Sequence, residues 1–126
     1  GLVVPVIRFA DNKSLGQIST EAKDLGAKAR DKKLSTPDMQ GNTFTISNLG
    51  MFDVEEFTAI INPPDACILA VGTIKEMPAI ENGTVVAQQQ MKLTLSCDHR
   101  VVDGATGAKF LQTLQKLLEN PMSLMV

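Results

Sequence analysis

The chain has 126 residues, of which 44% are hydrophobic and 21% charged, and its formal net charge is −2 at pH 7. That length suits one domain of ordinary globular composition. The weak net charge, with no basic run longer than Lys32-Lys33, argues against nucleic acid or an anionic membrane as partner, and the longest apolar run, residues 66–71, is too short to cross a bilayer. Because the first residue is Gly1 rather than Met, we expect the chain to be part of a longer reading frame.

The first third of the chain predicts an extended segment followed by a helix. Residues 2–7 are apolar and rich in β-branched side chains, so they predict a strand, with Pro5 favouring a sheet edge or a bulge. Ser14 stands at a helix N-cap, with Gln17 three residues later as in a capping box. A helix over residues 14–33 is expected, because apolar residues recur there at helical spacing: Leu15, Ile18, Ala22, Leu25 and Ala29.

The next segment predicts a short strand that ends in a polar side chain. Residues 43–47 alternate with period two, which places Phe44 and Ile46 on one face. Ser47 then ends the strand on its polar face. A turn and a weakly helical or irregular stretch are expected after it, up to residue 61.

The second half of the chain predicts three further strands or strand pairs and a helix. Residues 66–72 are apolar without alternation, as in a central strand that is covered on both faces. Asn82-Gly83 is typical of a tight hairpin turn. Residues 91–97 alternate like a half-buried strand, and residues 104–119 carry an amphipathic helix.

This order of elements predicts an α/β sandwich built on a mixed sheet. The two cysteines, Cys67 and Cys97, both lie in apolar or alternating runs, where a small buried side chain is the expected role and a disulfide is not expected. One histidine and two distant cysteines do not supply the four or so ligands at short spacing that a zinc site needs. No metal is therefore expected.

The candidate reactive residue is His99, the only histidine, which lies in a loop between the last strand and the last helix. A lone histidine is more often an ordinary surface or core residue than a catalyst. Asp103 precedes a helix and suits an N-cap, and Ser47 on its own is an ordinary strand-end serine. The spacing of these residues leaves a structural and a catalytic role open for each of them.

A resemblance to a known family favours the catalytic role. Residues 98–104, Asp-His-Arg-Val-Val-Asp-Gly, resemble the DHRxxDG signature of the 2-oxoacid dehydrogenase acyltransferases, which are related to chloramphenicol acetyltransferase. Residues 2–7, 43–52 and 60–72 are similar to the same family, as are Lys13-Ser14-Leu15 and Asn120-Pro121. The resemblance covers essentially the whole chain. It implies the chloramphenicol acetyltransferase-like fold, a two-layer sandwich with a mixed sheet and helices on one face, and it places residues 1–126 in the C-terminal portion of the catalytic domain, without the lipoyl and peripheral-subunit-binding domains.

The resemblance also implies a reaction, the transfer of an acyl group between a dihydrolipoyl thioester and coenzyme A. His99 matches the family's general base, and Ser47 matches the serine that stabilises the oxyanion. Asp103 matches an aspartate that pairs with an arginine from an earlier part of the domain, and Asn48 is a weaker candidate for substrate binding that also suits a turn. Coenzyme A or its acetyl ester is the expected substrate, the lipoyl group is carried on another domain, and no metal takes part.

In the family the site lies between subunits of a trimer, where the histidine of one subunit faces the serine of the next. Coenzyme A and the lipoyl arm enter from opposite ends. Trimers build a cubic or dodecahedral core, partly through an apolar C-terminal tail, for which Leu124 and Met125 are the candidate anchors here. The resemblance implies that the dehydrogenase components of the complex are partners and that neither nucleic acid nor a membrane is bound. The expected compartment is a bacterial cytoplasm or, alternatively, a mitochondrial matrix.

One departure and several alternatives accompany this hypothesis. Asp53 stands where the family usually has glycine, which could alter that turn. Residues 96–105 look most like the pyruvate branch, so an acetyl group is the expected substrate, with a succinyl or branched-chain specificity as the alternative. A non-catalytic structural core subunit, or a free-standing trimeric acetyltransferase of the antibiotic-modifying kind, also remains open.

Overall fold

The computed structural model describes residues 2–125, which form two compact units divided between Thr43 and Phe44. Within residues 2–125, the N-terminal unit contains one α-helix and two short 3-10 helices, and the C-terminal unit contains five strands and the second α-helix. Among the described residues, no helix has both the length and the apolar character needed to cross a membrane.

The N-terminal unit is organised around helix α1, Leu15–Arg30, which the sequence predicted. The Ser14 hydroxyl accepts a hydrogen bond from the Gln17 backbone N–H (3.2 Å), and the Gln17 side chain accepts one from the Ser14 N–H (2.8 Å), so the expected capping box is present. The helix ends earlier than expected, because Lys32 adopts a left-handed backbone conformation with φ 57°.

The predicted strand over residues 2–7 is wrong. The segment has no regular secondary structure and no neighbouring strand in the part of the chain that the structure describes, and its backbone is tied by a single backbone hydrogen bond, from the Val6 N–H to the Asp38 carbonyl (2.8 Å). Apolar, β-branched composition favours a strand only where a second strand completes the hydrogen-bond ladder. The Arg8 guanidinium instead ties this end of the chain to the carbonyls of Pro37 (2.9 Å) and Gln40 (3.2 Å).

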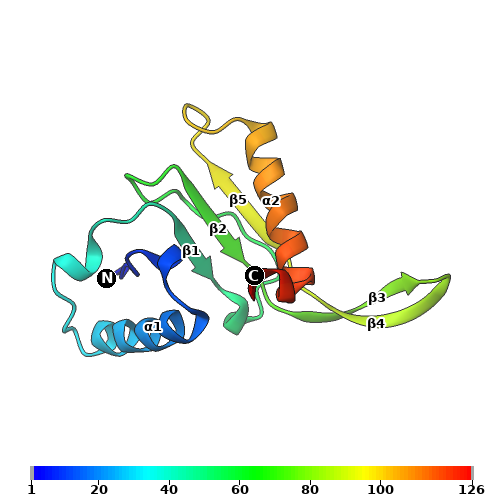
Figure 1. The fold of residues 1–126 in the computed structure, drawn as a ribbon, viewed down its shortest axis with the longest axis horizontal. Coiled ribbons are helices and arrows are strands. Elements are labelled where there is room, and N and C mark those ends of the chain that lie inside the picture. The colour runs from blue at the N-terminus through cyan, green and yellow to red at the C-terminus, as the bar shows by residue number, and fades with distance from the viewer. Residues whose placement is uncertain (1, 126) are drawn as a thin grey trace. The chain divides into compact units, whose positions relative to one another are not determined.

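The C-terminal unit is built on a three-stranded mixed sheet in the order β1-β2-β5 (Figure 1). Strand β1, Thr45–Asn48, runs parallel to β2, Cys67–Val71, and β5, Leu93–Cys97, runs antiparallel to β2. Strand β2 is central, as its uninterrupted apolar run predicted, and it supplies most of the core: Ile68, Leu69 and Ala70 are each less than a tenth exposed.

Helix α2, Gly104–Glu119, packs along β5 and forms the second layer of this unit (Figure 1). Gly107 is buried against the strand: a Cβ atom there would lie 3.4 Å from the Cys97 sulfur and 3.7 Å from a methyl group of Leu95. The rings of Phe44 and Phe110 lie 5.7 Å apart, centroid to centroid, and connect the start of β1 to the same helix. The α/β class and the mixed sheet are therefore confirmed.

A separate two-stranded sheet projects from this unit as a hairpin arm of β3, Lys75–Glu81, and β4, Thr84–Gln90 (Figure 1). Its turn is the predicted one, since Asn82 and Gly83 both have positive φ, 51° and 79°. At the base of the arm Glu55 accepts ion pairs from Lys75 (3.6 Å) and Lys92 (3.3 Å). Because these side chains are well exposed, the ion pairs orient the arm more than they stabilise the unit.

The chain leaves β2 through a crowded backbone crossing at Gly72. Its N–H donates to the Lys92 carbonyl (3.0 Å), and the next N–H, of Thr73, donates to the Val54 carbonyl (2.8 Å). A Cβ atom on Gly72 would lie 2.0 Å from the Glu55 carbonyl oxygen. Only glycine fits, because the obstacle is backbone that a side-chain rotation cannot move.

Replacement of Gly72 by alanine is therefore expected to destabilise the unit by about 3 kcal/mol or more, at the upper end of the range for overpacking. Equilibrium unfolding in urea measures the loss. Gly104→Ala is the matched control: Gly104 is the first residue of α2 and nothing lies within 4 Å of a Cβ there, so the unfolding free energy should change by less than about 1 kcal/mol. Equal unfolding free energies for the two variants would contradict the inference that the backbone at Gly72 leaves no room for a Cβ atom.

Candidate active site

The loop that carries His99 is held by the residue before it, Asp98. The Asp98 N–H continues the sheet by donating to the Ala66 carbonyl (2.7 Å), and the Asp98 carbonyl accepts the N–H groups of Val101 and Val102 (2.9 Å each). The backbone therefore turns sharply between the end of β5 and the start of α2, with its polar groups satisfied. His99 lies at this turn.

The Asp98 carboxylate forms a two-pronged ion pair with Arg100. The guanidinium donates from Nε to Oδ1 (3.0 Å) and from a terminal nitrogen to Oδ2 (2.8 Å), and the Arg100 backbone N–H also donates to Oδ1 (3.0 Å). These bonds lower the pKa of Asp98 from 3.8 to about 2 and raise the pKa of Arg100. The side chains on both sides of His99 are thus tied to each other.

The His99 imidazole itself is exposed. Within residues 2–125 no hydrogen bond or ion pair reaches either ring nitrogen. The ring therefore stands on a hydrogen-bonded turn and is exposed to solvent in the isolated chain. Such a ring can accept a proton from a group that another molecule brings to it.

Asp103 caps helix α2, as the sequence predicted. Its Oδ1 accepts the backbone N–H of Thr106 (2.7 Å), and that bond lowers the pKa of the Asp103 carboxyl. Among residues 2–125, no arginine forms an ion pair with Asp103. The cap fixes where the His99 loop joins the helix, which is a structural role; the pairing with an arginine remains an expectation.

Ser47 is the third residue of β1 and is half-buried. It lies on the same face of the strand as Thr45, and that face is more buried than the apolar one: Thr45 is 7% exposed and Ile46 is 65% exposed. Burial of Thr45 is possible because its hydroxyl donates to the carboxylate of Asp65, itself only 6% exposed. Ser47 therefore follows an anchored position on its strand.

Asn48 and Asp53 shape the turn that follows Ser47. The Asn48 side-chain oxygen accepts the N–H of Gly50 (2.8 Å), so its role as a turn residue is confirmed, whereas a role in substrate binding stays a prediction. Asp53 has φ 59°, in the left-handed region that favours glycine. Aspartate tolerates this region better than most residues, so the turn persists with a carboxylate, which lies 3.8 Å from the Lys75 ammonium.

The fold places Ser47 and His99 at opposite ends of the three-stranded sheet. Ser47 lies opposite Ala70 on β2, whereas Cys97 lies opposite Cys67. Those two positions on β2 are three residues apart, a distance of about 10 Å at a rise of about 3.3 Å per residue, and His99 lies beyond Cys97. The structure therefore does not bring the two candidate residues together within one chain.

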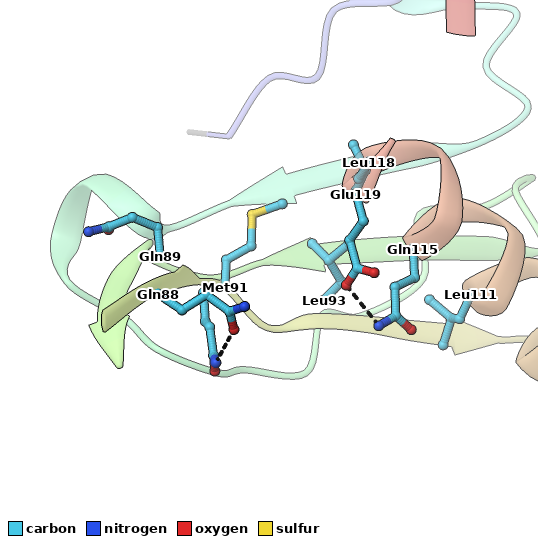
Figure 2. Close-up of a pocket in the computed structure, with 9 residues that line it drawn as sticks. Gln88, Gln89, Met91, Leu93, Leu111, Gln115, Leu118 and Glu119 are labelled. Carbon is cyan, nitrogen blue, oxygen red and sulfur yellow. Dashed lines mark hydrogen bonds between the residues drawn. The ribbon is translucent and has the colours of Figure 1, made fainter. Parts of the chain in front are cut away.

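An open cleft of about 960 Å³ lies elsewhere, between the last residues of β4 at the base of the hairpin arm, β5 and the C-terminal half of α2 (Figure 2). It includes none of the candidate residues. Two hydrogen bonds join lining residues within single elements: on α2 the Gln115 side chain donates to Glu119 (3.0 Å), and on β4 the Gln90 side chain donates to Gln88 (2.8 Å). Over residues 2–125 there is likewise no group of three or more His, Cys, Asp or Glu side chains that could hold a metal ion.

Two supporting contacts were missed by sequence reasoning. The Asp98–Arg100 pair could have been found, since opposite charges on both sides of a lone histidine are visible in the sequence. The Asp65–Thr45 contact could not, because Asp65 follows two prolines and is typical of an exposed turn in the sequence. Its burial depends on the parallel pairing of β1 with β2.

The sequence matches the family of 2-oxoacid dehydrogenases acyltransferase (catalytic domain) over residues 1–126. It is 56% identical to the mitochondrial dihydrolipoyllysine-residue acetyltransferase component of the pyruvate dehydrogenase complex of Schizosaccharomyces pombe, covering 100% of this chain and 27% of the relative. It is 46% identical to the corresponding component of Rhizobium meliloti, covering 100% of this chain and 28% of the relative. The chain thus spans less than a third of the length of these curated relatives.

Solved structures of the same kind match the fold. Azotobacter vinelandii dihydrolipoamide acetyltransferase superposes with a TM-score of 0.95 at 43% identity, over 100% of this chain and 52% of that one. The cubic core of a pyruvate dehydrogenase multienzyme complex gives a TM-score of 0.95 at 42% identity, over the same shares of the two chains. The chloramphenicol acetyltransferase-like architecture expected from the sequence is consistent with these matches.

The ion pair next to His99 predicts a pH dependence. Because the pKa of Asp98 is about 2 in the folded chain and about 3.9 in an unfolded one, the ionised carboxylate stabilises the fold above pH 4, and this contribution is lost as the pH falls to about 2. In Asp98→Asn the loss is absent, so stability should fall less steeply between pH 4 and pH 2. Urea unfolding at several pH values gives the free energy of unfolding as a function of pH for the wild type and for Asp98→Asn. Equal slopes for the two proteins between pH 4 and pH 2 would contradict the stabilising ion pair.

Proposed function

The chain belongs to the family of 2-oxoacid dehydrogenase acyltransferase catalytic domains, and we propose that its protein transfers acetyl groups between dihydrolipoyl thioesters and coenzyme A. His99 acts as general base and Ser47 as oxyanion donor. The substrates follow from the acetyltransferase relatives, two of which are 56% and 46% identical to this chain. Those relatives favour an acetyl group over a succinyl or branched-chain acyl group.

The reaction starts with a proton transfer. The thiol of coenzyme A, with an ordinary pKa of about 8.5, is mostly protonated at neutral pH, so a base must remove its proton before it can attack a thioester. His99 accepts that proton, and the thiolate adds to the thioester carbonyl. The intermediate collapses by breaking the bond to the dihydrolipoyl sulfur, which receives the proton back from the His99 imidazolium.

The tetrahedral intermediate carries negative charge on its oxygen, and the Ser47 hydroxyl donates a hydrogen bond to it. The support for this role lies in how Ser47 is held. Thr45, two residues earlier on the same face, is buried against Asp65, and Asn48, the next residue, closes a turn onto Gly50. A donor fixed in this way needs little reorganisation when charge develops.

The observation that carries the proposal is a match of spacing. In Azotobacter vinelandii dihydrolipoamide acetyltransferase a serine, a histidine and an asparagine were investigated for their role in the catalytic mechanism; the serine precedes the histidine by 52 residues, and the asparagine follows it by four. Ser47 and His99 are likewise 52 residues apart, and Asp103 follows His99 by four. Aspartate and asparagine both accept backbone N–H groups at a helix N-terminus, so either can hold the histidine loop.

The proposed site needs two chains. Ser47 and His99 lie at opposite ends of one sheet, so a second subunit has to bring its serine to the histidine of the first. A homotrimer with three such interfaces satisfies this requirement. Coenzyme A and the lipoyl arm then approach the junction from opposite sides, and the dehydrogenase components of the complex deliver and reoxidise the lipoyl group.

A non-catalytic core subunit is the competing hypothesis from another functional class. The presence of Ser47, His99 and Asp103 at the spacing of the Azotobacter residues argues against it. The compartment is that of the complex, a bacterial cytoplasm or a mitochondrial matrix. The higher identity to the Schizosaccharomyces pombe mitochondrial relative favours the matrix.

Loss of either side chain should slow the reaction without loss of assembly. We expect His99→Ala to reduce kcat by about 10²- to 10⁴-fold, as for loss of a general base, and Ser47→Ala by about 10²- to 10³-fold. The assay follows acetyl transfer from acetyl-CoA to dihydrolipoamide by the full-length protein. Wild-type rates for His99→Ala would contradict the proposal.

Co-expression of the two variants tests whether the site is shared between subunits. In mixed trimers about one quarter of the interfaces pair an intact histidine with an intact serine, so about that fraction of wild-type activity should return. The double variant His99→Ala, Ser47→Ala, co-expressed with His99→Ala, is the control, because it offers no complete interface. Activity that stays at the level of the single variants would exclude a site made by two chains.

The C-terminal tail is proposed to join trimers into a larger core. It forms a short 3-10 helix, Pro121–Met125, in which Leu124 is 48% exposed and Met125 is 70% exposed. Apolar side chains of this size, when buried against a neighbour, each contribute about 2 kcal/mol to the contact. Met122, on the same turn, is 73% exposed and adds to this apolar surface.

Leu124→Asp is therefore expected to leave trimers that no longer assemble into the large core, because a carboxylate cannot be buried at the contact without a partner. Light scattering on the full-length variant measures the mass of the assembled particles. Leu124→Met keeps the apolar volume and should assemble normally. Intact large particles with Leu124→Asp would show that the tail does not carry the contact.

A further inference from the structure

Cys67 and Cys97 are two free thiols that face each other across the sheet. They are direct partners in the register of β2 and β5, and their sulfur atoms lie 3.6 Å apart. Nothing in the proposed acyl transfer uses them. Two thiols in contact within one chain raise the question of whether they can be joined.

The backbone geometry at this position suits a disulfide. The neighbouring pair, Ala66 and Asp98, is a hydrogen-bonded pair, because the Asp98 N–H donates to the Ala66 carbonyl. Hydrogen-bonded and non-hydrogen-bonded pairs alternate along antiparallel strands, so Cys67 and Cys97 form a non-hydrogen-bonded pair, with Cα atoms about 4.5 Å apart. That separation lies within the range of about 4.4 to 6.8 Å found for disulfides.

Only side-chain rotation is then needed to close the bond. The sulfur atoms must approach from 3.6 Å to about 2.05 Å. Gly107 of α2 packs over Cys97, and the absence of a side chain there leaves the Cys97 sulfur 3.4 Å from where a Cβ would be. Both cysteines are half-buried, so each keeps some contact with solvent.

We propose that Cys67 and Cys97 form a reversible intramolecular disulfide when a small peroxide oxidises the protein. One thiolate attacks the peroxide oxygen and breaks the O–O bond, which gives a sulfenic acid and a hydroxide ion; the hydroxide takes up the proton that the thiol had released and becomes water. The second thiol then displaces the hydroxyl from that sulfur as a second water molecule, and the S–S bond forms. Two thiols lose two electrons, the peroxide gains them, and a dithiol reductant reverses the reaction.

The location gives this modification a consequence for the neighbouring loop. Cys97 ends β5 and directly precedes Asp98, whose backbone and side chain hold the turn at His99. A bond between β2 and β5 at this point fixes the base of that turn to the central strand. The thiol pair is thus a redox-sensitive position beside the candidate site, and it does not depend on the assignment of His99 as a base.

Burial and the adjacent Cys97 thiol raise the pKa of the Cys67 thiol. The thiolate is the reactive form, so oxidation should be slow at neutral pH and faster in mildly alkaline solution. A reduced pair at rest, oxidised only under peroxide stress, is the expected behaviour.

The experiment uses the full-length protein, exposed to hydrogen peroxide at mildly alkaline pH, alkylated under denaturing conditions and digested with trypsin. Mass spectrometry should find the peptides of Cys67 and Cys97 joined, with two hydrogens lost and neither thiol alkylated. Treatment with dithiothreitol before alkylation should restore both thiols. Cys67→Ser and Cys97→Ser should each give no linked peptide. In each variant the remaining cysteine should stay a free thiol or form a sulfenic acid that dimedone traps.

Two results would overturn the proposal. Both cysteines could remain fully alkylatable after peroxide treatment of the folded wild-type protein, or they could be found only as sulfinic acids or in disulfides between chains. Because the wild-type comparison needs no variant, a folding defect in either serine variant would leave the test intact.

Discussion

The pairing of β2 with two strands that run in opposite directions is the constraint on which the C-terminal unit depends. Strand β1 lies parallel to β2, and β5 lies antiparallel to it. The carboxyl end of β1 and the carboxyl end of β5 therefore fall at opposite ends of the sheet. Because Ser47 lies near the carboxyl end of β1 and His99 follows the carboxyl end of β5, the fold separates the two side chains within one chain.

The two ends of the sheet are held by different kinds of interaction. At the end near Ser47, close backbone packing dominates: Gly72 passes the Glu55 carbonyl without room for a Cβ, and the Leu49 N–H donates to the Val71 carbonyl (3.2 Å). At the end near His99, charge and helix capping dominate, through Asp98 and Asp103. Each end of the sheet is thus held by contacts within one chain.

The cysteine pair lies at the end of the sheet near His99. The hydrogen bond from the Asp98 N–H to the Ala66 carbonyl continues the sheet up to the turn at His99, and it also makes the adjacent pair, Cys67 and Cys97, one without backbone hydrogen bonds between its members. Turn geometry and thiol proximity are therefore two results of one strand register. A redox change in the pair would act on the base of the same turn.

The local elements could be predicted from the amino-acid sequence, because the capping box at Ser14, the Asn82-Gly83 turn, the central apolar strand and the Asp103 cap all depend on residues near one another in the chain. The family could be predicted as well, from residues 98–104 and matching segments elsewhere. Three features became visible only in the folded chain: residues 2–7 are not a strand, Thr45 is buried against Asp65, and Ser47 and His99 lie apart. These features depend on which distant segments pair and in which direction, and composition and periodicity carry no information about partners far along the chain.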